Sequence, residues 1–286
     1  MIKIYPISRS VGLTLGRGIV NTLKYHNGFN SFGLHGSLGS GKAYANDADY
    51  VCFVSTLPSK LELTAIKYGN ELEKANGMKF VETEYRNSIN PPSQHMTLLF
   101  DKHKLSIHML TKSTLIDLMK KFNNFNDFPQ SFYKGYLIET EVLYDKDKLL
   151  VNSKKVLENY PQNVRKEIMK KNIKSFIFYV NRLNDVAKKN NEFLEYHCLY
   201  QAVEKSLLFG YACNRLYFLE NWKRIKEELS QTDIQPDNFL IDLQQVITTP
   251  HEDLKYKIKI LKNLEKKLKK ICKKEGIPLP TKIDLL

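Results

Sequence analysis

Residues 36–49 read Gly-Ser-Leu-Gly-Ser-Gly-Lys-Ala-Tyr-Ala-Asn-Asp-Ala-Asp, and this stretch fits two motifs that handle phosphates in different ways. Read as Gly-x-x-x-x-Gly-Lys, its first part matches most of the phosphate-binding loop of an NTPase. Read as Gly-Ser, nine residues and then Asp-x-Asp, the whole stretch supplies a phosphate-binding turn and two metal-binding carboxylates. The two motifs require different secondary structure after the lysine, so the flanking residues decide between them.

The NTPase motif fails at the residue that follows its lysine. The motif needs a Ser or Thr there because the hydroxyl group ligates Mg²⁺, and this chain has Ala43. The loop must also open a helix whose backbone N–H groups point at the phosphates. Instead, residues 50–54 read Tyr-Val-Cys-Phe-Val, which is typical of a strand. We therefore favour the second motif, with Gly41 and Lys42 in a flexible loop over a triphosphate.

The second motif agrees with the strands expected around it. A strand through residues 32–35 ends at Gly36, where the missing Cβ lets the backbone approach a phosphate. Ser37 adds a hydroxyl and an N–H group. Asp47 and Asp49 begin the next strand, so their carboxylates share one face, about 6–7 Å apart along the chain. Carboxylates and substrate phosphates are preferred ligands of Mg²⁺. A polar turn leading into a strand is the alternative interpretation.

His35-Gly36-Ser37 followed by Asp47-Ala48-Asp49-Tyr50-Val51 resembles the signature of the nucleotidyltransferase superfamily, which has the DNA polymerase β-like fold. The resemblance is to its two-domain minimal and antibiotic-modifying members. Residues 141–147 of this chain are similar to the segment that closes the catalytic domain in those proteins. It implies transfer of a nucleoside monophosphate, with AMP expected, from an NTP to an acceptor hydroxyl. The implied metal ion, Mg²⁺ or Mn²⁺, is held by Asp47 and Asp49, and the implied nucleotide contacts are Gly36, Ser37 and Lys42.

The third catalytic position departs from the pattern of that superfamily. Its members usually carry a third carboxylate on a later strand, and His108 is the residue that aligns there. An imidazole can act as a base near neutral pH or ligate a metal ion, so we treat His108 as a catalytic candidate. A histidine with only a structural role is the alternative. The other carboxylates that can supply a base are Glu82, Glu84, Asp101, Glu139 and Glu141.

The chain is expected to be an α+β protein in two parts. Residues 1–150 are predicted to form a mixed-sheet domain, because strand-like runs alternate with helical patterns, and residues 151–286 an all-α helical bundle. The resemblance implies that the first is the nucleotidyltransferase catalytic domain and that the second binds the acceptor. Helices are expected over residues 9–25, 58–76, 114–122, 162–190, 192–218, 220–231, 237–247 and 251–274, and strands over 32–35, 47–54, 79–85, 96–100 and 105–110.

Composition indicates a cytoplasmic protein with no membrane segment. At 286 residues the chain can bury one large core or two modest ones. No apolar run approaches the roughly 18 residues that a membrane span needs, and the first 23 residues lack a signal-peptide core. The four cysteines are scattered without a Cys-x-x-Cys pair, which argues against a disulfide framework or a zinc site.

Positive charge is concentrated in the second half of the chain. The net charge is +13, of which +9 lies in residues 149–286. Much of it falls on the helix expected over residues 251–274, where lysines fill the faces that an apolar stripe leaves open. A solvated helix face is the simpler interpretation, and electrostatic attraction of tRNA or another polyanion is the functional one.

Three functions remain open from the sequence. The first is a nucleotidyltransferase whose acceptor is a small molecule such as an antibiotic, as the resemblance implies. The second is a toxin-type nucleotidyltransferase that acts on tRNA or on a protein hydroxyl. The third is a catalytically degenerate module that binds a nucleotide without chemistry, for which His108 in place of a carboxylate is the main support.

Overall fold

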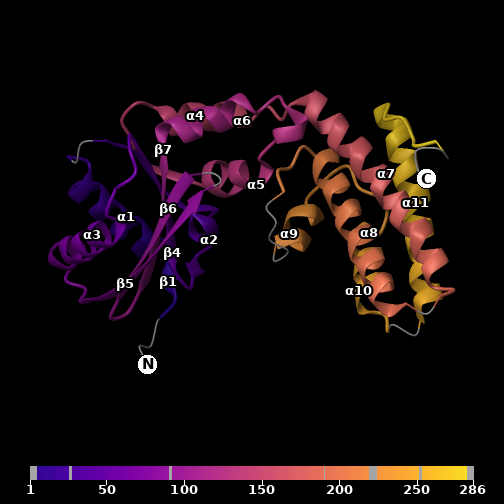
Figure 1. Ribbon diagram of the computed structural model, residues 1–286, viewed down its shortest axis with the longest axis horizontal. Coiled ribbons are helices and arrows are strands. Elements are labelled where there is room, and N and C mark those ends of the chain that lie inside the picture. Colours follow the sequence, from indigo (N-terminus) through magenta and orange to yellow (C-terminus); the bar gives the residue numbers. More distant parts are fainter. Residues whose placement is uncertain are drawn as a thin grey trace. The chain divides into compact units, whose positions relative to one another are not determined.

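The chain forms two compact units, which are described separately. The first comprises Met1–Phe122 and Pro129–Asn159, and the second comprises Asn123–Phe128 and Tyr160–Leu286. The first is built on a mixed β-sheet and the second on helices, so the predicted α+β class is confirmed (Figure 1). The computed structural model describes residues 5–25, 28–89, 92–189, 191–218, 224–250 and 253–281.

A six-stranded sheet organises the first unit. Its strand order is β5-β6-β7-β4-β2-β8, and every neighbouring pair is antiparallel except β4 and β7, which run parallel. The parallel pair forms because α3 carries the chain from β4 across to β5, after which two hairpin steps return it to β7. The strands are β2 (Phe29–His35), β4 (Ala48–Val54), β5 (Phe80–Ile89), β6 (Pro92–Phe100), β7 (Lys104–Thr111) and β8 (Glu141–Asp145).

One face of this sheet is apolar and packs on helices α1 (Arg9–Leu23) and α3 (Leu61–Asn76). Because side chains alternate along a strand, register partners on neighbouring strands point to the same face. Leu34, Tyr50 and Ile107 form one such row, and all three are fully buried. Figure 1 shows α1 and α3 together on one side of the sheet. The opposite face therefore carries the remaining, mostly polar residues of the same strands.

A polar contact links the apolar core to α1. The hydroxyl of Tyr50 donates a hydrogen bond of 2.7 Å to the carbonyl of Gly12, which satisfies a buried polar group in the core. Helix α1 begins where the side chain of Ser8 accepts a hydrogen bond from the N–H of Val11. The helix predicted over residues 9–25 is thus confirmed to within two residues at its end.

Several short elements of the first unit were not expected from the sequence. Strands β1 (Ile7–Ser8) and β3 (Tyr44–Ala45) pair in a two-stranded sheet. The other short elements are α2 (Gly36–Gly39), η1 (Phe125–Asp127, in the second unit), α5 (Gln130–Phe132), a π-helical turn η2 (Tyr133–Ile138) and α6 (Leu149–Leu157). Helix α4 (Lys112–Lys120) was expected. Apart from α6, the unexpected elements have at most six residues and are too short to show a period, so their sequences gave little signal.

The second unit is a helical bundle, as predicted. The buried guanidinium of Arg165 ties three of its helices together, because it donates to the carbonyl of Cys213 at 2.9 Å and pairs with Glu275 at 2.7 Å. The first residues of the helices expected over 220–231 and 251–274 lie outside the described residues. The helices are α7 (Gln162–Val186), α8 (Glu192–Cys213), α9 (Ile225–Ser230), α10 (Phe239–Thr248) and α11 (Leu254–Glu275).

No helix in the described ranges is long and apolar enough to cross a membrane. The four cysteines, Cys52, Cys198, Cys213 and Cys272, are all buried and unbridged. The absence of a disulfide framework agrees with the prediction from their scattered positions.

Candidate active site

The turn after β2 brings the Gly-Ser pair against one of the two predicted carboxylates. Gly36 begins α2 with φ +65°, a left-handed conformation that favours glycine. A Cβ built on Gly36 would lie 2.8 Å from Oδ2 of Asp49 and would overlap it. Asp49 is also the register partner of His35, the residue before the turn. The backbone of the turn and the carboxylate of Asp49 therefore lie close together, with no room for a side chain at position 36 unless Asp49 moves.

The glycine-rich segment is a well-packed helical turn, whereas the sequence led us to expect a flexible loop. Leu38 is fully buried, and the N–H of Ser40 donates to the carbonyl of Gly36 at 3.0 Å. A Cβ on Gly39 would overlap the backbone carbonyls of Leu34 and Glu139. Close packing against two neighbouring segments thus fixes the turn, a constraint that glycine content alone does not reveal. Gly41 follows this turn. It has a left-handed φ of +97° and open space around it.

Arg9 anchors the turn from outside. Its Nε donates to the carbonyl of Leu38 at 3.2 Å, and its guanidinium forms an ion pair with Glu141 on β8. The backbone N–H of Arg9 donates to the carbonyl of Ala43 at 2.8 Å, next to the short β1–β3 ladder. Sequence reasoning missed this role of Arg9. The contacts join the start of α1, the end of the turn and β8, so they fix the position of the backbone that faces Asp49.

Asp47 and Asp49 lie near each other at the start of β4. Burial and the charge of Asp47 raise the pKa of Asp49 to about 7, while Lys104 and a hydrogen bond from Ser106 act in the opposite direction. Asp47 is more exposed and pairs with Lys104 at 3.7 Å. A carboxyl whose pKa is raised to near neutrality, first by burial and then by a neighbouring carboxylate, is a candidate functional group, and a bound cation would favour its ionised form.

The side chain of β7 that meets Asp49 is Ser106. The parallel register pairs Asp49 with Ser106, and Ser106 is buried and donates to the Asp49 carboxylate. His108 pairs instead with Val51, two residues further along both strands. Ser106 was not singled out from the sequence, because the register between two strands separated by more than 50 residues is not encoded locally.

His108 belongs to a cluster of rings on the polar face of the sheet. The ring centroids of His108 and His95 lie 4.2 Å apart, and His95 is its register partner on β6. The rings of His35 and Tyr136 each lie 5.3 Å from that of His108. The Tyr136 hydroxyl lies 3.2 Å from Nδ1 of His108. We define these four residues as the histidine cluster: His35, His95, His108 and Tyr136.

The three imidazoles of the histidine cluster are neutral near pH 7. Burial, followed by the charges of neighbouring groups, lowers the pKa of His108 far below its usual range. Burial also lowers the pKa values of His35 and His95 to about 4. Nε2 of His35 is buried and has no hydrogen-bond partner among the described residues. The cluster therefore presents uncharged nitrogen atoms, and it is adjacent to Asp49 because His35 is the register partner of that residue.

The predicted site residues are partly brought together. Gly36, Asp47 and Asp49 meet at one place, with Ser37 in the first turn of α2. Lys42 is exposed just after the turn, where its N–H donates to the carbonyl of Ser37 at 3.0 Å. Over the described parts of the chain, no three or more His, Cys, Asp and Glu side chains are grouped as a complete metal site.

Two carboxylates nevertheless fit a phosphate-bound Mg²⁺. Mg²⁺ commonly takes one or two protein carboxylates and completes its octahedron with water and substrate phosphates. Repulsion from Asp47 contributes to the raised pKa of Asp49, and a divalent cation between them would remove that repulsion. The donor set therefore agrees with an ion that arrives with a nucleotide rather than one held in an all-protein cage.

Comparison with known proteins gives a structural likeness alone. No protein-family model matches the chain, and no curated protein matches it. A nucleotidyltransferase-like protein from Exiguobacterium sibiricum 255-15 is similar in structure, with a TM-score of 0.47 and 11% identity over 92% of this chain and 77% of that one. The CdnC:HORMA-deltaN complex of E. coli MS115-1 gives a TM-score of 0.29 and 13% identity over 91% of this chain and 90% of that one. Function is therefore argued from the residues of the site.

Proposed function

We propose that this protein is a Mg²⁺-dependent nucleotidyltransferase that moves a nucleoside monophosphate from an NTP, with ATP as the expected donor, to an acceptor hydroxyl and releases pyrophosphate. The observation that carries the proposal is the contact between the Gly36 backbone and the Asp49 carboxylate. This contact supports the proposal because phosphoryl transfer needs a turn that binds phosphate and a carboxylate that binds metal at one place, and these are the roles proposed for Gly36 and Asp49. By the resemblance noted above, the acceptor is a hydroxyl-bearing small molecule such as an antibiotic.

The turn at Gly36–Gly39 is proposed to bind and orient the triphosphate. Gly36 offers backbone to the phosphates without an intervening Cβ, Ser37 adds an N–H and a hydroxyl, and Lys42 supplies a positive charge from the following loop. The contacts of Arg9 with Leu38 and Glu141 keep the turn in place, which reduces the reorganisation needed when the nucleotide binds.

Asp47 and Asp49 are the residues proposed to hold Mg²⁺. The bound ion would neutralise phosphate charge and stabilise the leaving pyrophosphate. Holding it requires that Asp49 be ionised, and its pKa of about 7 means that about half of the molecules lose a proton at that pH when the ion binds. Lys104 pairs with Asp47 at 3.7 Å, and an ion bound at Asp47 would free its ammonium group to pair with the phosphates.

His108 is proposed to receive the hydrogen bond of the acceptor hydroxyl. Its imidazole is neutral, and Tyr136 at Nδ1 orients the ring. The lowered pKa makes it a weak base, so its main contribution is to position the hydroxyl, with proton transfer late in the reaction.

A nucleotide-binding module without chemistry is the second candidate. It is favoured by one specific observation, which is that Asp49 meets Ser106 from β7 rather than a third carboxylate. It predicts that a non-hydrolysable ATP analogue with Mg²⁺ raises the melting temperature while no pyrophosphate appears from ATP with any acceptor.

The test is pyrophosphate release and transfer of label from α-labelled NTPs, with Mg²⁺ or Mn²⁺ and a panel of hydroxyl-bearing acceptors. The double variant Asp47→Ala/Asp49→Ala is expected to lose activity by at least about 10³-fold, the scale of losing electrostatic stabilisation at the reacting phosphate. Asp117→Ala, at an exposed ion pair on α4, is the matched control and keeps full activity. Activity that survives in the double variant would refute the assignment.

A further inference from the structure

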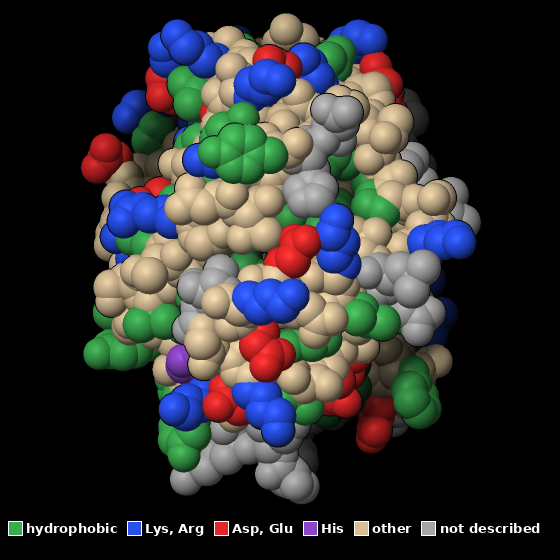
Figure 2. Space-filling model, turned by 90° about the vertical axis from the view of Figure 1, so that its left-hand side faces the viewer, with side chains coloured by type: hydrophobic (Ala, Val, Ile, Leu, Met, Phe, Trp, Pro, Cys, Tyr) green, Lys and Arg blue, Asp and Glu red, His purple; other side chains and the backbone are tan. Residues whose placement is uncertain are grey.

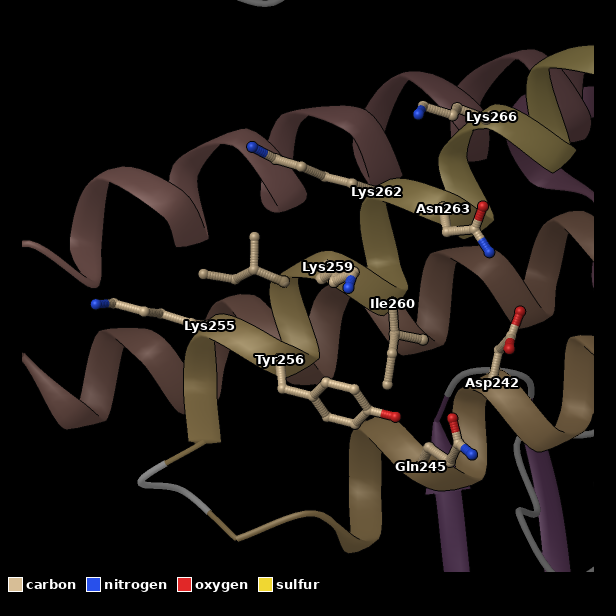
Figure 3. A pocket seen from close by; sticks show the side chains of 10 residues that line it. Asp242, Gln245, Lys255, Tyr256, Lys259, Ile260, Lys262, Asn263 and Lys266 are labelled. Carbon is tan, nitrogen blue, oxygen red and sulfur yellow. The ribbon is translucent and has the colours of Figure 1, made fainter.

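The second unit has a groove between α10 and α11 that the proposed function does not use. The groove has a volume of about 750 Å³, and α11 supplies most of its lining (Figure 3). Its lining combines lysines with one aromatic ring, two side-chain amides and one carboxylate. The residues that line it are Asp242, Gln245, Lys255, Tyr256, Ile258, Lys259, Ile260, Lys262, Asn263 and Lys266.

The lysines of α11 form a continuous positive face. At 100° per residue, the positions 255, 259, 262, 266, 270 and 273 lie within about 60° of one direction. These six residues span 18 positions, or about 27 Å at about 1.5 Å per residue. All six are exposed and form no ion pair with any described carboxylate. We call this face the lysine stripe: Lys255, Lys259, Lys262, Lys266, Lys270 and Lys273.

The carboxylates of α10 and α11 near the stripe are already neutralised. Helix α11 contains ten lysines and only two acidic residues. Glu265 pairs with Lys269, and Glu275 pairs with Arg165 on α7. Asp242, the carboxylate in the groove, accepts from Lys267 at 2.6 Å. Among the described residues, the four lysines of the groove therefore have no carboxylate that neutralises them.

This arrangement differs from an ordinary solvated surface. Figure 2 shows a face of the molecule on which Lys and Arg side chains alternate with Asp and Glu side chains. On the lysine stripe, like charges instead follow each other at three- and four-residue spacing, which destabilises a helix. Binding of a polyanion would remove this repulsion, since each phosphate can be met by a lysine along the helix.

The groove also offers groups that recognise bases. The ring of Tyr256 is half exposed and is directed across the groove toward Gln245 on α10, while Lys255 and Lys262 extend outward from α11 (Figure 3). A tyrosine face can stack on an unpaired base, and the amides of Gln245 and Asn263 can donate to and accept from base edges. In a duplex the bases are stacked on each other and the ring would have no partner.

We propose that the groove between α10 and α11 binds single-stranded nucleic acid. The lysine stripe follows the phosphate backbone, and Tyr256 stacks on a base between Gln245 and Asn263. The inference does not rest on the proposed nucleotidyltransferase activity, because its residues lie in the second unit and its test measures binding.

The test is fluorescence anisotropy with a labelled, mixed-sequence single-stranded RNA of about 16 nucleotides, the upper range of one binding site, repeated with the DNA of the same sequence and with duplexes. Affinity is measured from low to high salt. The quadruple variant Lys255→Gln/Lys259→Gln/Lys262→Gln/Lys266→Gln is expected to make the slope of log K against log salt shallower by about 3, since each lost phosphate contact on a single strand contributes about 0.7.

The matched control removes the same charge elsewhere in the second unit. Lys166, Lys170, Lys188 and Lys189 are exposed on or just after α7 and do not line the groove. Their replacement by Gln is expected to change the slope by less than about 1. Tyr256→Ala is expected to weaken binding about 5- to 150-fold at constant salt, as losing one stacked base does, while Tyr256→Phe keeps it within about twofold.

Three outcomes would overturn the proposal: equal losses in the groove variant and the α7 control, tighter binding of duplex than of single strands, or unchanged affinity of Tyr256→Ala. Binding of either single strand with the expected losses supports it. The replaced lysines are exposed, and removing like charges from α11 is expected to leave its melting temperature unchanged or higher. The Tyr256 pair of variants provides an independent measurement if the quadruple variant does not fold.

Discussion

Replacing Asp49 by Asn is expected to stabilise the metal-free protein at alkaline pH. The folded state raises the pKa of this carboxyl from 3.8 to about 7, mainly through burial and secondarily through Asp47. Above pH 7, folding therefore keeps an ionised carboxylate in an environment that disfavours its charge. Asn has a similar shape and no charge, so it removes this penalty.

The sign and size of the effect follow from proton linkage. Between pH 3.8 and 7 the folded state binds more protons at Asp49 than the unfolded state, so its contribution to stability falls as the pH rises. The interval corresponds to about 4 kcal/mol at about 1.4 kcal/mol per pH unit, and solvent at the partly exposed carboxyl reduces it toward about 2 kcal/mol. At pH 5 only about a third of the full effect has developed.

The measurement is the free energy of unfolding of both proteins in EDTA at pH 5 and pH 8. Hydrogen exchange of amides in β4 and β7 restricts the readout to the first unit. The quantity to compare is the difference in unfolding free energy between the two proteins. The neutral histidines of the cluster make both proteins less stable as the pH falls below 6.5, so their contribution cancels in this difference. Asp101→Asn, in the exposed turn between β6 and β7, is the control with no expected pH-dependent gain.

Mg²⁺ with a non-hydrolysable NTP is expected to reverse the order of stability, because only the wild-type carboxylate holds the ion. The reasoning is refuted if Asp49→Asn destabilises the metal-free protein at pH 8, or if its gain is the same at pH 5 and pH 8.

Three further outcomes are expected. Gly36→Ala should cost about 1–3 kcal/mol in thermal unfolding and abolish nucleotide-dependent stabilisation, while Gly77→Ala, with nearly the same φ but open space around it, should show only the backbone cost. Arg9→Met should raise KM for the NTP more than it lowers kcat, and equal effects on both would contradict a positioning role. His108→Gln should gain about 2 kcal/mol of stability relative to wild type between pH 7 and pH 5, measured by urea unfolding, because the wild-type ring resists protonation.

Much of the fold was predictable because it depends on local periodicity. Runs of β-forming residues around Tyr50 and Ile107 identified β4 and β7, and the helical stripe of Leu254, Ile258 and Leu261 identified α11. A period of two or of 3.6 is present in the residues themselves and needs no partner to be detected. Short elements such as α2 lack this repetition, so the sequence predicts a flexible loop where the structure has a helical turn.

The sequence by itself determined the class of the two units and the spacing of Gly36, Asp47 and Asp49. Only the tertiary structure decided that β4 and β7 are parallel neighbours in a register that pairs Asp49 with Ser106 and places His108 against His95. It also decided the pKa of Asp49, since burial and the distance to Asp47 arise from packing. Strand order and register depend on contacts between residues far apart in the chain, and a slip of one residue would turn the polar row to the opposite face.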